Sequence, residues 1–366
     1  MDKREKRQIV ELFIISVLLW FSLFVYLPTL PLFLKGKIDS LGTVGLILSM
    51  YGFAQLTVRI PAGIFSDRTG RRKAILIFCF LAMGIGPLML LHGNSVIVLM
   101  VARTLTGIGA AAWVILVTLF TSLFPRSRIV AASALITIAN GVGKSLSTLL
   151  TGFINESGGP EAVFYVATGS SVVALIILFS MRIPREKPWV MSFSDTLSVF
   201  GRREVVVATI GHGTAMIALW AVILSFLPVQ ARELGAGDVE ISIIFSLHLA
   251  AFTLSNYLNS RLSSRVSVKR RVFAAALFFS LGNLGTAWGA SIGMLAAAGI
   301  ISGLGFGFLQ SSFIGYSISR VEQNRRSSAL GFHQSLYSAG IFIGPWIGGV
   351  LADAVGIGTM SLIVAL

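Results

Sequence analysis

Long apolar stretches dominate the chain: eleven of 18 residues or more and a shorter last one alternate with short polar connectors. About 20 apolar residues let an α-helix cross a bilayer, and a soluble domain has no counterpart to so many of them. The bilayer offers the backbone no hydrogen-bond partners, so the stretches must be helices, and the alternating segments of a membrane barrel are absent. The sequence therefore predicts an all-α polytopic membrane protein.

A polar segment, Arg182 to Arg203, divides the stretches into two sets of six. The first set is Ile9 to Leu34, Leu41 to Ile64, Ala74 to Leu91, Val96 to Phe120, Ile129 to Ile154 and Ala162 to Met181. The second is Val205 to Val229, Ile241 to Leu262, Val272 to Ala290, Ile292 to Ile318, Ala329 to Leu351 and a twelfth that begins near Gly358. We predict an N-terminal six-helix bundle over 1–181, a linker over 182–203 and a C-terminal bundle over 204–366.

The positions of the basic residues predict the orientation, because short cytoplasmic connectors are enriched in lysine and arginine. All but six of the 29 fall in connectors on one side: Met1 to Gln8, Asp67 to Lys73, Pro125 to Arg128, Arg182 to Arg203, Arg261 to Arg271 and Arg320 to Arg326. We therefore predict a multi-pass protein of the cell (plasma) membrane with a cytoplasmic N-terminus and linker, in a bacterial or archaeal inner membrane. The net charge of +14 then reflects topology rather than nucleic-acid binding.

The two halves resemble each other when the chain is shifted by about 197 residues along itself. The matches are Tyr26-Leu27-Pro28 with Phe226-Leu227-Pro228, Thr106 to Gly109 with Ser302 to Gly305, and Gly143 and Gly152 with Gly340 and Gly349. Chance matches among glycine-rich helices are the alternative. A duplication predicts two pseudo-symmetric bundles. It also predicts a twelfth helix longer than the residues up to Leu366 allow, so that helix looks truncated.

The connector between the second and third stretches reads Gly63-Ile64-Phe65-Ser66-Asp67-Arg68-Thr69-Gly70-Arg71-Arg72. It resembles the G-x-x-x-D-R-x-G-R-R loop of the major facilitator superfamily. An R-x-x-x-G-x-G-A pattern at Arg103 to Ala110 and the glycines and proline of the eleventh stretch support the resemblance, which covers essentially the whole chain. The resemblance, in particular to drug and metabolite exporters, implies a transporter that works by alternating access.

The loop has the properties of a conformational latch. Gly63 permits close helix approach, Gly70 a tight turn, and Asp67 can accept hydrogen bonds from the free amides of a helix N-terminus. The resemblance implies that this helix is the one that starts near Ser327, in the other half. The predicted latch comprises Gly63, Asp67, Arg68, Gly70, Arg71 and Arg72. Ser122 stands where family members often carry an acidic partner for the loop, and the alternative is that the basic residues only fix the topology.

Two basic residues lie deep inside predicted spans, where a charge must find partners or water. Arg103 lies about eight residues into the fourth stretch, and Lys144 lies about fifteen residues into the fifth, roughly 22 Å from its start. We predict that both face a cavity or take part in coupling. The alternatives are a structural hydrogen-bonding role for Arg103 and outward snorkelling or an ion pair for Lys144.

Further candidates for contact with a solute or a coupling ion lie on helices that the resemblance places around the cavity: Asn140, Trp113, Tyr26, Trp220, His248 and Gln310. Packing or interface anchoring is the alternative for the aromatic residues, and a satisfied core histidine for His248. Small residues favour close contact between membrane helices. Those predicted to serve it are Gly107, Gly109, Gly340, Gly344, Pro345 and Gly348.

The acidic residues decide between classes of solute. All fifteen lie in connectors or near span ends, whereas an exporter of cations needs an embedded carboxylate. The sequence therefore favours proton-coupled efflux of small amphipathic, neutral or anionic compounds by a monomer. Proton-symport uptake of an organic anion or sugar is one alternative, and a non-transporting membrane sensor is another. We expect no cofactor, no metal site, no nucleic-acid partner and no enzyme chemistry; Cys79 is the only cysteine.

Overall fold

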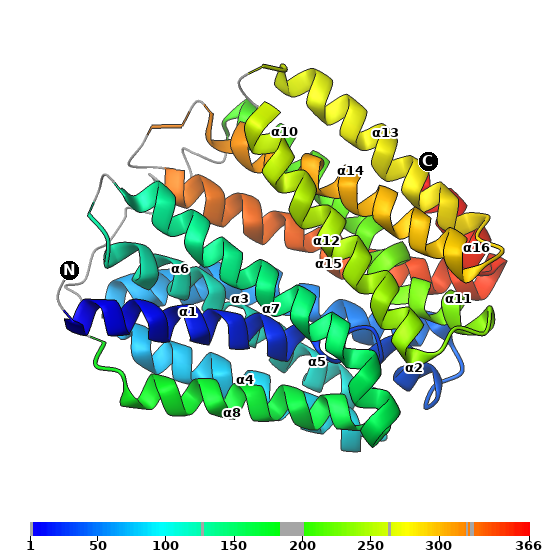
Figure 1. The fold of residues 1–366 in the computed structure, drawn as a ribbon, viewed down its shortest axis with the longest axis horizontal. Helices are drawn as coiled ribbons and strands as arrows, with labels where there is room; N and C mark the ends of the chain where they lie inside the picture. The colour runs from blue at the N-terminus through cyan, green and yellow to red at the C-terminus, as the bar shows by residue number, and fades with distance from the viewer. Residues whose placement is uncertain (1–2, 126–127, 184–200, 263–264, 320, 323–325) are drawn as a thin grey trace.

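The computed structural model describes residues 3–125, 128–183, 201–262, 265–319, 321–322 and 326–366. Every regular element within these residues is a helix, which confirms the all-α prediction. Figure 1 shows the helices running roughly along one direction, with the N-terminal half below and the C-terminal half above. Most of the predicted linker, 182–203, lies outside the described residues.

The N-terminal half contains α1 (Lys3–Phe24), α2 (Leu30–Lys35), α3 (Leu41–Thr69), α4 (Arg72–His92), α5 (Val96–Ala110), α6 (Ala112–Ser122), α7 (Ile129–Gly158) and α8 (Ala162–Ser180). The C-terminal half contains α10 (Arg203–Ala218), η2 (Leu219–Phe226), α11 (Leu227–Glu233), α12 (Asp238–Leu262), α13 (Val268–Ala287), α14 (Ile292–Ile318), α15 (Arg326–Val355) and α16 (Ile357–Ala365). The halves meet where α3 packs on α15 and α7 packs on α12.

Three predicted spans are interrupted. The first divides into α1 and α2, the fourth changes from α5 to α6 at Ala111, and the seventh consists of α10, the π-helix η2 and α11. Pro31 and Pro228 stand in the first turn of α2 and α11, where a missing amide proton costs least. Hydropathy alone did not reveal these breaks, because the residues on either side of each are equally apolar.

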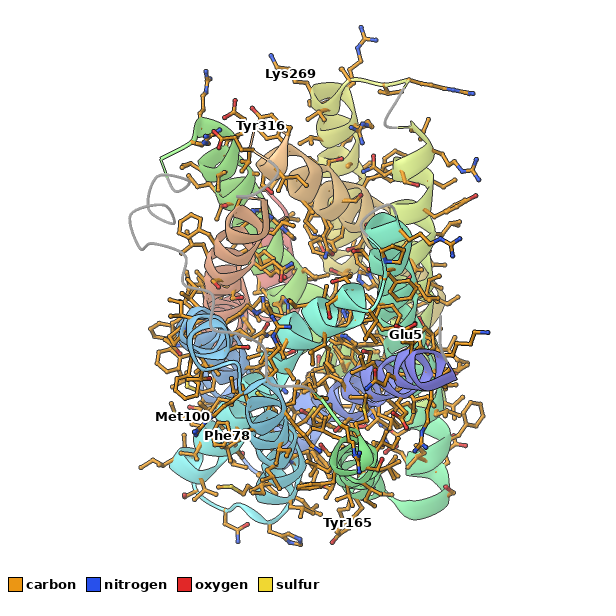
Figure 2. The ribbon with its side chains drawn as sticks, turned by 90° about the vertical axis from the view of Figure 1, so that its left-hand side faces the viewer. Glu5, Phe78, Met100, Tyr165, Lys269 and Tyr316 are labelled. Carbon is orange, nitrogen blue, oxygen red and sulfur yellow. The ribbon has the colours of Figure 1, made fainter. Side chains whose placement is uncertain are left out.

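Nine helices or helix runs in the described part are long and apolar enough to cross a membrane. The other predicted spans correspond to α7, α13 and the nine-residue α16. Large apolar side chains project from the sides of the bundle, for example Phe78, which is 58% exposed, and Tyr165. Figure 2 views the molecule along the helices from the end where the N-terminus lies and shows both residues at the outer edge of the N-terminal half. Such a surface suits lipid as its solvent.

The internal repeat is visible in how equivalent glycines pack. A Cβ on Gly143 of α7 would lie 2.6 Å from the carbonyl oxygen of Val17 in α1, and a Cβ on Gly340 of α15 would overlap the carbonyl oxygen of Gly213 in α10. A Cβ on Gly107 of α5 would likewise lie 2.6 Å from the carbonyl oxygen of Tyr51 in α3. The two halves therefore use the same helix contacts, as the predicted pseudo-symmetry requires.

Candidate functional site

The end of the molecule opposite the N-terminus, here called the distal face, joins the two halves through hydrogen bonds. The carboxylate of Asp353 in α15 accepts the amide protons of Leu41 and Gly42, each at 2.8 Å, and the hydroxyl proton of Ser40 at 2.7 Å. These donors form the N-terminus of α3, where the helix dipole favours a negative charge. The distal face is therefore held together by a carboxylate that caps a helix of the other half.

Three further contacts close the distal face. Lys35 of α2 pairs with Glu233 of α11 at 2.8 Å, and a Cβ on Gly152 of α7 would overlap Val239 in the first turn of α12. A Cβ on Gly349 would likewise overlap the backbone of Leu41 in the first turn of α3. Gly152 and Gly349 are equivalent in the repeat, so both crossings between the halves use the same device.

The contact between α3 and α15 extends along most of both helices and then ends. A Cβ on Gly52 would lie 2.5 Å from the carbonyl carbon of Ile341, and Nη1 of Arg59 donates to the carbonyl oxygen of Gln334 at 3.3 Å. The helices are antiparallel, so the next facing positions are Gly63 and Gly331. No described atom lies within 4 Å of a Cβ on either glycine. At the end where the N-terminus lies, here called the proximal face, these two positions make no close helix contact with a described atom.

The predicted latch lies at this proximal end of α3. Gly70 ends α3 with a left-handed φ of 61° and donates its amide proton to Ser66, which agrees with the expected tight turn. Arg71 is exposed and Arg72 is buried, whereas the side chains of Asp67 and Arg68 lie outside those that the structure describes. The close approach expected at Gly63 is not made by any described atom in this conformation. Ser122 donates to the carbonyl oxygen of Leu119 in its own helix.

Arg103 of α5 is buried in a cluster of aromatic and hydroxyl groups and is only 1% exposed. Its Nη1 donates to Tyr26 at 3.1 Å and lies 3.4 Å from the hydroxyl of Thr106. The guanidinium also lies 4.5 Å from the ring centroid of Tyr51 in α3, which stacks at 5.4 Å on Trp220 in the other half. Cation–π contact thus connects Arg103, through Tyr51, to the junction between the halves.

Lys144 of α7 lies against aromatic rings instead of a carboxylate. Its ammonium lies 4.1 Å from the ring centroid of Trp20 and 4.9 Å from that of Phe24, both in α1, and no described residue forms an ion pair with it. Trp113 of α6 meets Trp20 edge-on at 5.4 Å. Lys144 therefore does not use the ion pair that was one alternative. Among the described residues, ring faces alone balance its charge, which leaves its ammonium protons for another partner.

The remaining candidates lie apart from these two clusters. His248 is buried in α12 and its Nδ1 lies 3.0 Å from the carbonyl oxygen of Gly299, which is the arrangement of a satisfied core histidine. Asn140 and Gln310 are half-buried. Gly109, Gly344 and Gly348 each lie at a close helix contact, and the carbonyl of Pro345 faces Gly45 across the junction.

Sequence reasoning missed several polar contacts that the fold creates. Asp353 and Arg59 connect the halves, and His212 and His333 meet within the C-terminal half. The repeat could have indicated the histidine pair: His212 precedes the Gly213 that Gly340 contacts, and His333 lies two turns before Gly340. No sequence signal indicated the cap that Asp353 makes. Its equivalent in the repeat is Glu156, and Glu156 makes no such cap among the described residues.

One cavity, of about 340 Å³, opens at the proximal face beside α1. Its lining includes Arg7 and Glu11 of α1 and Arg182, the first residue of the predicted linker, and no residue of the C-terminal half. A solute site that is reached from both sides in turn must lie between the halves, so this cavity is not the candidate site. The candidate site is the junction around Arg103, Tyr51, Trp220 and Lys144.

The architecture defines the class of protein. Two pseudo-symmetric helical bundles meet around buried basic residues, and hydrogen bonds and an ion pair join them at the distal face, as in membrane transporters. The sequence profile of the Major Facilitator Superfamily matches residues 12–229 and 208–366. The chain belongs to this superfamily of membrane transporters.

Individual relatives are also named as transporters or efflux pumps, but their names indicate different solutes. The chain is 28% identical over 264 residues to the probable anion transporter 6 of Oryza sativa subsp. japonica, which covers 68% of this chain and 58% of the relative. It is 26% identical over 148 residues to the multi-drug resistance efflux pump PmrA of Streptococcus pneumoniae, which covers 39% and 37%. The chain spans about half the length of the curated relatives it matches.

A solved structure shares the fold over nearly the whole chain. A mutant form of the nucleoside transporter NupG superposes with a TM-score of 0.84 at 16% sequence identity and covers 98% of this chain and 96% of its own. This likeness supports the arrangement of the helices.

Proposed function

We propose that this chain is a secondary active transporter that works by alternating access and exports small amphipathic, neutral or anionic compounds in exchange for protons. The observation that carries the proposal is the contact of α3 with α15, which is close from Ser40 to Arg59 and shows no close approach of a described atom at Gly63. A transporter that exposes its site to one side at a time needs such a contact at each face in turn. The predicted latch at Asp67 would form when the proximal face closes.

The charges at the junction support the proposed class of solute. Arg103 and Lys144 place two positive charges there, and the described ion pairs lie near the ends of the helices. A net positive lining attracts anions, tolerates neutral solutes and repels cations. The aromatic rings of Trp20, Tyr51 and Trp220 add apolar surface that an amphipathic molecule can cover.

We further propose that the proximal face is cytoplasmic and that the chain acts as a monomer in an inner membrane. Arg71 and Lys269 lie exposed at this face, and Figure 2 shows Lys269 at its rim. A concentration of basic residues is typical of the cytoplasmic side. The bundles 1–181 and 204–366 would then move relative to each other about the junction, with 182–203 as the cytoplasmic linker.

Transport by purified protein in proteoliposomes tests the proposal. We would compare benzoate, uridine and tetraphenylphosphonium as anionic, neutral and cationic probes, with and without a pH gradient. We expect benzoate or uridine to leave the compartment on the cytoplasmic side of the protein faster than either solute crosses protein-free vesicles. A pH gradient should accelerate this movement further. Tetraphenylphosphonium should be unaffected. No movement of any probe in either direction would contradict the proposal.

Uptake of an organic anion by proton symport is the second candidate. It is favoured by the position of Lys144 and by the name of the rice relative. The two candidates differ in which direction of the pH gradient accelerates benzoate: exchange requires opposite proton and solute movement, and symport requires the same direction. The proteoliposome measurement distinguishes them directly.

Lys144→Gln should lower the apparent affinity for benzoate roughly tenfold, since a hydrogen bond to a charged group contributes about 1.5–3 kcal/mol. The affinity for uridine should change little. Concentration-dependent uptake into proteoliposomes measures both. Lys269→Gln, at an exposed lysine of the rim, is the control and should resemble the unchanged protein. Equal affinities for benzoate before and after Lys144→Gln would remove this lysine from the site.

Asp67→Asn should reduce transport at least about tenfold, because a charge-assisted cap on a helix N-terminus is lost from the state with a closed proximal face. The amount of protein inserted in the membrane should stay the same. Transport rate per inserted molecule is the measurement, and Asp39→Asn at the distal face is the control. Full activity of Asp67→Asn would refute the latch.

A further inference from the structure

His212 of α10 and His333 of α15 form a hydrogen-bonded pair that is fully buried in the C-terminal half. Nδ1 of His212 lies 3.0 Å from Nε2 of His333, and both residues are 0% exposed. At a rise of 1.5 Å per residue, His212 lies about 14 Å from the start of α10 and His333 about 10 Å from the start of α15. Both therefore belong to the membrane-embedded part. The proposed exchange requires a group that binds protons there, and the acidic residues do not supply one.

The hydrogen bonds around the pair assign its protons. The hydroxyl of Thr209 donates to the carbonyl oxygen of Val205 at 2.7 Å, so at 3.1 Å from Nδ1 of His333 it can only accept. His333 therefore carries its proton on Nδ1 and presents a bare Nε2. His212 must donate to that nitrogen from Nδ1, which leaves its own Nε2 without a proton.

Nε2 of His212 has no hydrogen-bond partner in the structure and is buried. A bare, buried imidazole nitrogen is a vacant acceptor. The rings around it are those of Tyr337, at 4.3 Å between centroids, and of Phe306 and Phe313, each at 6.1 Å. Ring faces stabilise an imidazolium without forming a fixed ion pair, so this lining can receive a proton and release it again.

Apart from Tyr337, the charged and titratable groups on the helices around the pair lie further from it. Tyr337 of α15 contacts His212 through its ring, and Tyr316 of α14 lies one turn beyond Phe313. Arg203 and Glu204 begin α10, and Arg59 of α3 contacts Gln334, the neighbour of His333. No described carboxylate forms an ion pair with either imidazole, so the protonation of the pair is controlled by the pair and its ring lining.

We propose that the His212–His333 pair is the proton-binding site of this transporter, and that a proton binds at Nε2 of His212. The protonated pair then carries one positive charge in total. This charge can reside on either ring, because the Nδ1 proton of His212 can pass to Nε2 of His333. Its role in moving solute rests on the proton-coupled transport proposed above.

Proton binding reaches the junction between the halves through α15. This helix carries His333, and the adjacent Gln334 accepts the hydrogen bond from Arg59 of α3. In this conformation the added proton on Nε2 of His212 faces only aromatic rings and has no hydrogen-bond acceptor, so protonation favours a form that supplies one. Low pH should therefore shift the protein toward the opposite form, in which the distal face is open.

Nitrogen NMR of the purified protein, labelled with ¹⁵N in its four histidines, tests the site without any solute. We expect His333 to be protonated on Nδ1 at high pH, and the signals of both rings to change together on acidification while the protein stays folded. Thr209→Val removes the acceptor of that Nδ1 proton and should separate the two titrations. His248→Gln is the control and should leave them unchanged. Rings that stay neutral throughout, or that titrate independently in the unchanged protein, would overturn the proposal.

Spin labels report the conformational consequence, in protein with Cys79→Ser. Labels at Ser122 and Lys269 span the proximal face, and labels at Asn94 and Ala290 span the distal face; all four residues are exposed. On acidification the distance between the labels at Ser122 and Lys269 should shorten, and the distance between those at Asn94 and Ala290 should lengthen. The ratio of the two forms should change by at most about tenfold per pH unit for one proton. His212→Gln and His333→Gln should abolish the response. An unchanged response in both would overturn the proposal.

The proteoliposome assay separates this proposal from the transport proposal. If His212→Gln and His333→Gln still move benzoate with the original dependence on a pH gradient, the proton site is wrong and the transporter stands. If the unchanged protein moves no probe but the rings and the spin labels respond to pH as described, the proton site stands and the transport proposal is wrong.

Discussion

Asp353→Asn should shift the protein toward the conformation in which the distal face is open. The carboxylate accepts three hydrogen bonds at the N-terminus of α3, and an amide keeps only part of this capacity and none of the charge. Since Asp353 is exposed to solvent, we expect a loss of about 1–2 kcal/mol, which corresponds to a change of about five- to thirtyfold in the ratio of the two forms. Electron spin resonance distances between labels at Asn94 and Ala290 measure this ratio.

Glu240→Gln provides a matched control for this experiment. Glu240 is also a carboxylate at the distal face and accepts the amide proton of Gly237 at 2.7 Å, but both residues belong to the C-terminal half. Its replacement should leave the distance between the labels unchanged. The interpretation of Asp353 fails if the two variants behave alike, or if Asp353→Asn leaves the distal face closed.

Arg103→Met should abolish most transport while the protein becomes no less stable to heat. The guanidinium is buried without a carboxylate partner among the described residues, so its desolvation costs free energy of folding that two hydroxyl contacts and ring faces only partly offset. Methionine fills a similar volume without that cost. We expect a loss of transport of more than about tenfold, as for removal of a charged contact, with an unchanged or higher melting temperature.

Two variants at Tyr51 locate the origin of this effect. Tyr51→Phe keeps the ring between Arg103 and Trp220 and should retain transport, whereas Tyr51→Ala removes it and should resemble Arg103→Met. Transport by reconstituted protein and thermal unfolding in detergent are measured for each. If Arg103→Met lowers the melting temperature in parallel with transport, then the arginine has the structural role that the sequence left open.

The sequence predicted the helices and their order well, because length and hydropathy alone decide which segments can enter a bilayer. It also predicted that Arg103 and Lys144 are unusual, since any charge in such a segment requires an explanation. It did not predict their partners. For Lys144 it left an ion pair open, and the structure shows the rings of Trp20 and Phe24 instead.

The Gly63 to Arg72 loop illustrates the same limit. Its residues predicted a latch between the halves, and the αL turn at Gly70 has the expected conformation. Whether the latch is engaged depends on the conformation of the whole protein, and here Gly63 and Gly331 have no described neighbour within 4 Å of a Cβ. A local motif predicts a contact, and only the tertiary structure shows whether a given conformation makes it.

By itself, the sequence determined the membrane class, the two-fold repeat, the family resemblance and the surplus of positive charge inside the spans. Only the tertiary structure decided that Asp353 caps α3, that His212 meets His333 and that Tyr51 stacks on Trp220. The physical reason is that hydropathy places a residue within the membrane but does not choose the helix that it faces. That choice comes from packing between helices more than a hundred residues apart, where small residues let backbones approach and bring distant polar groups within hydrogen-bonding distance.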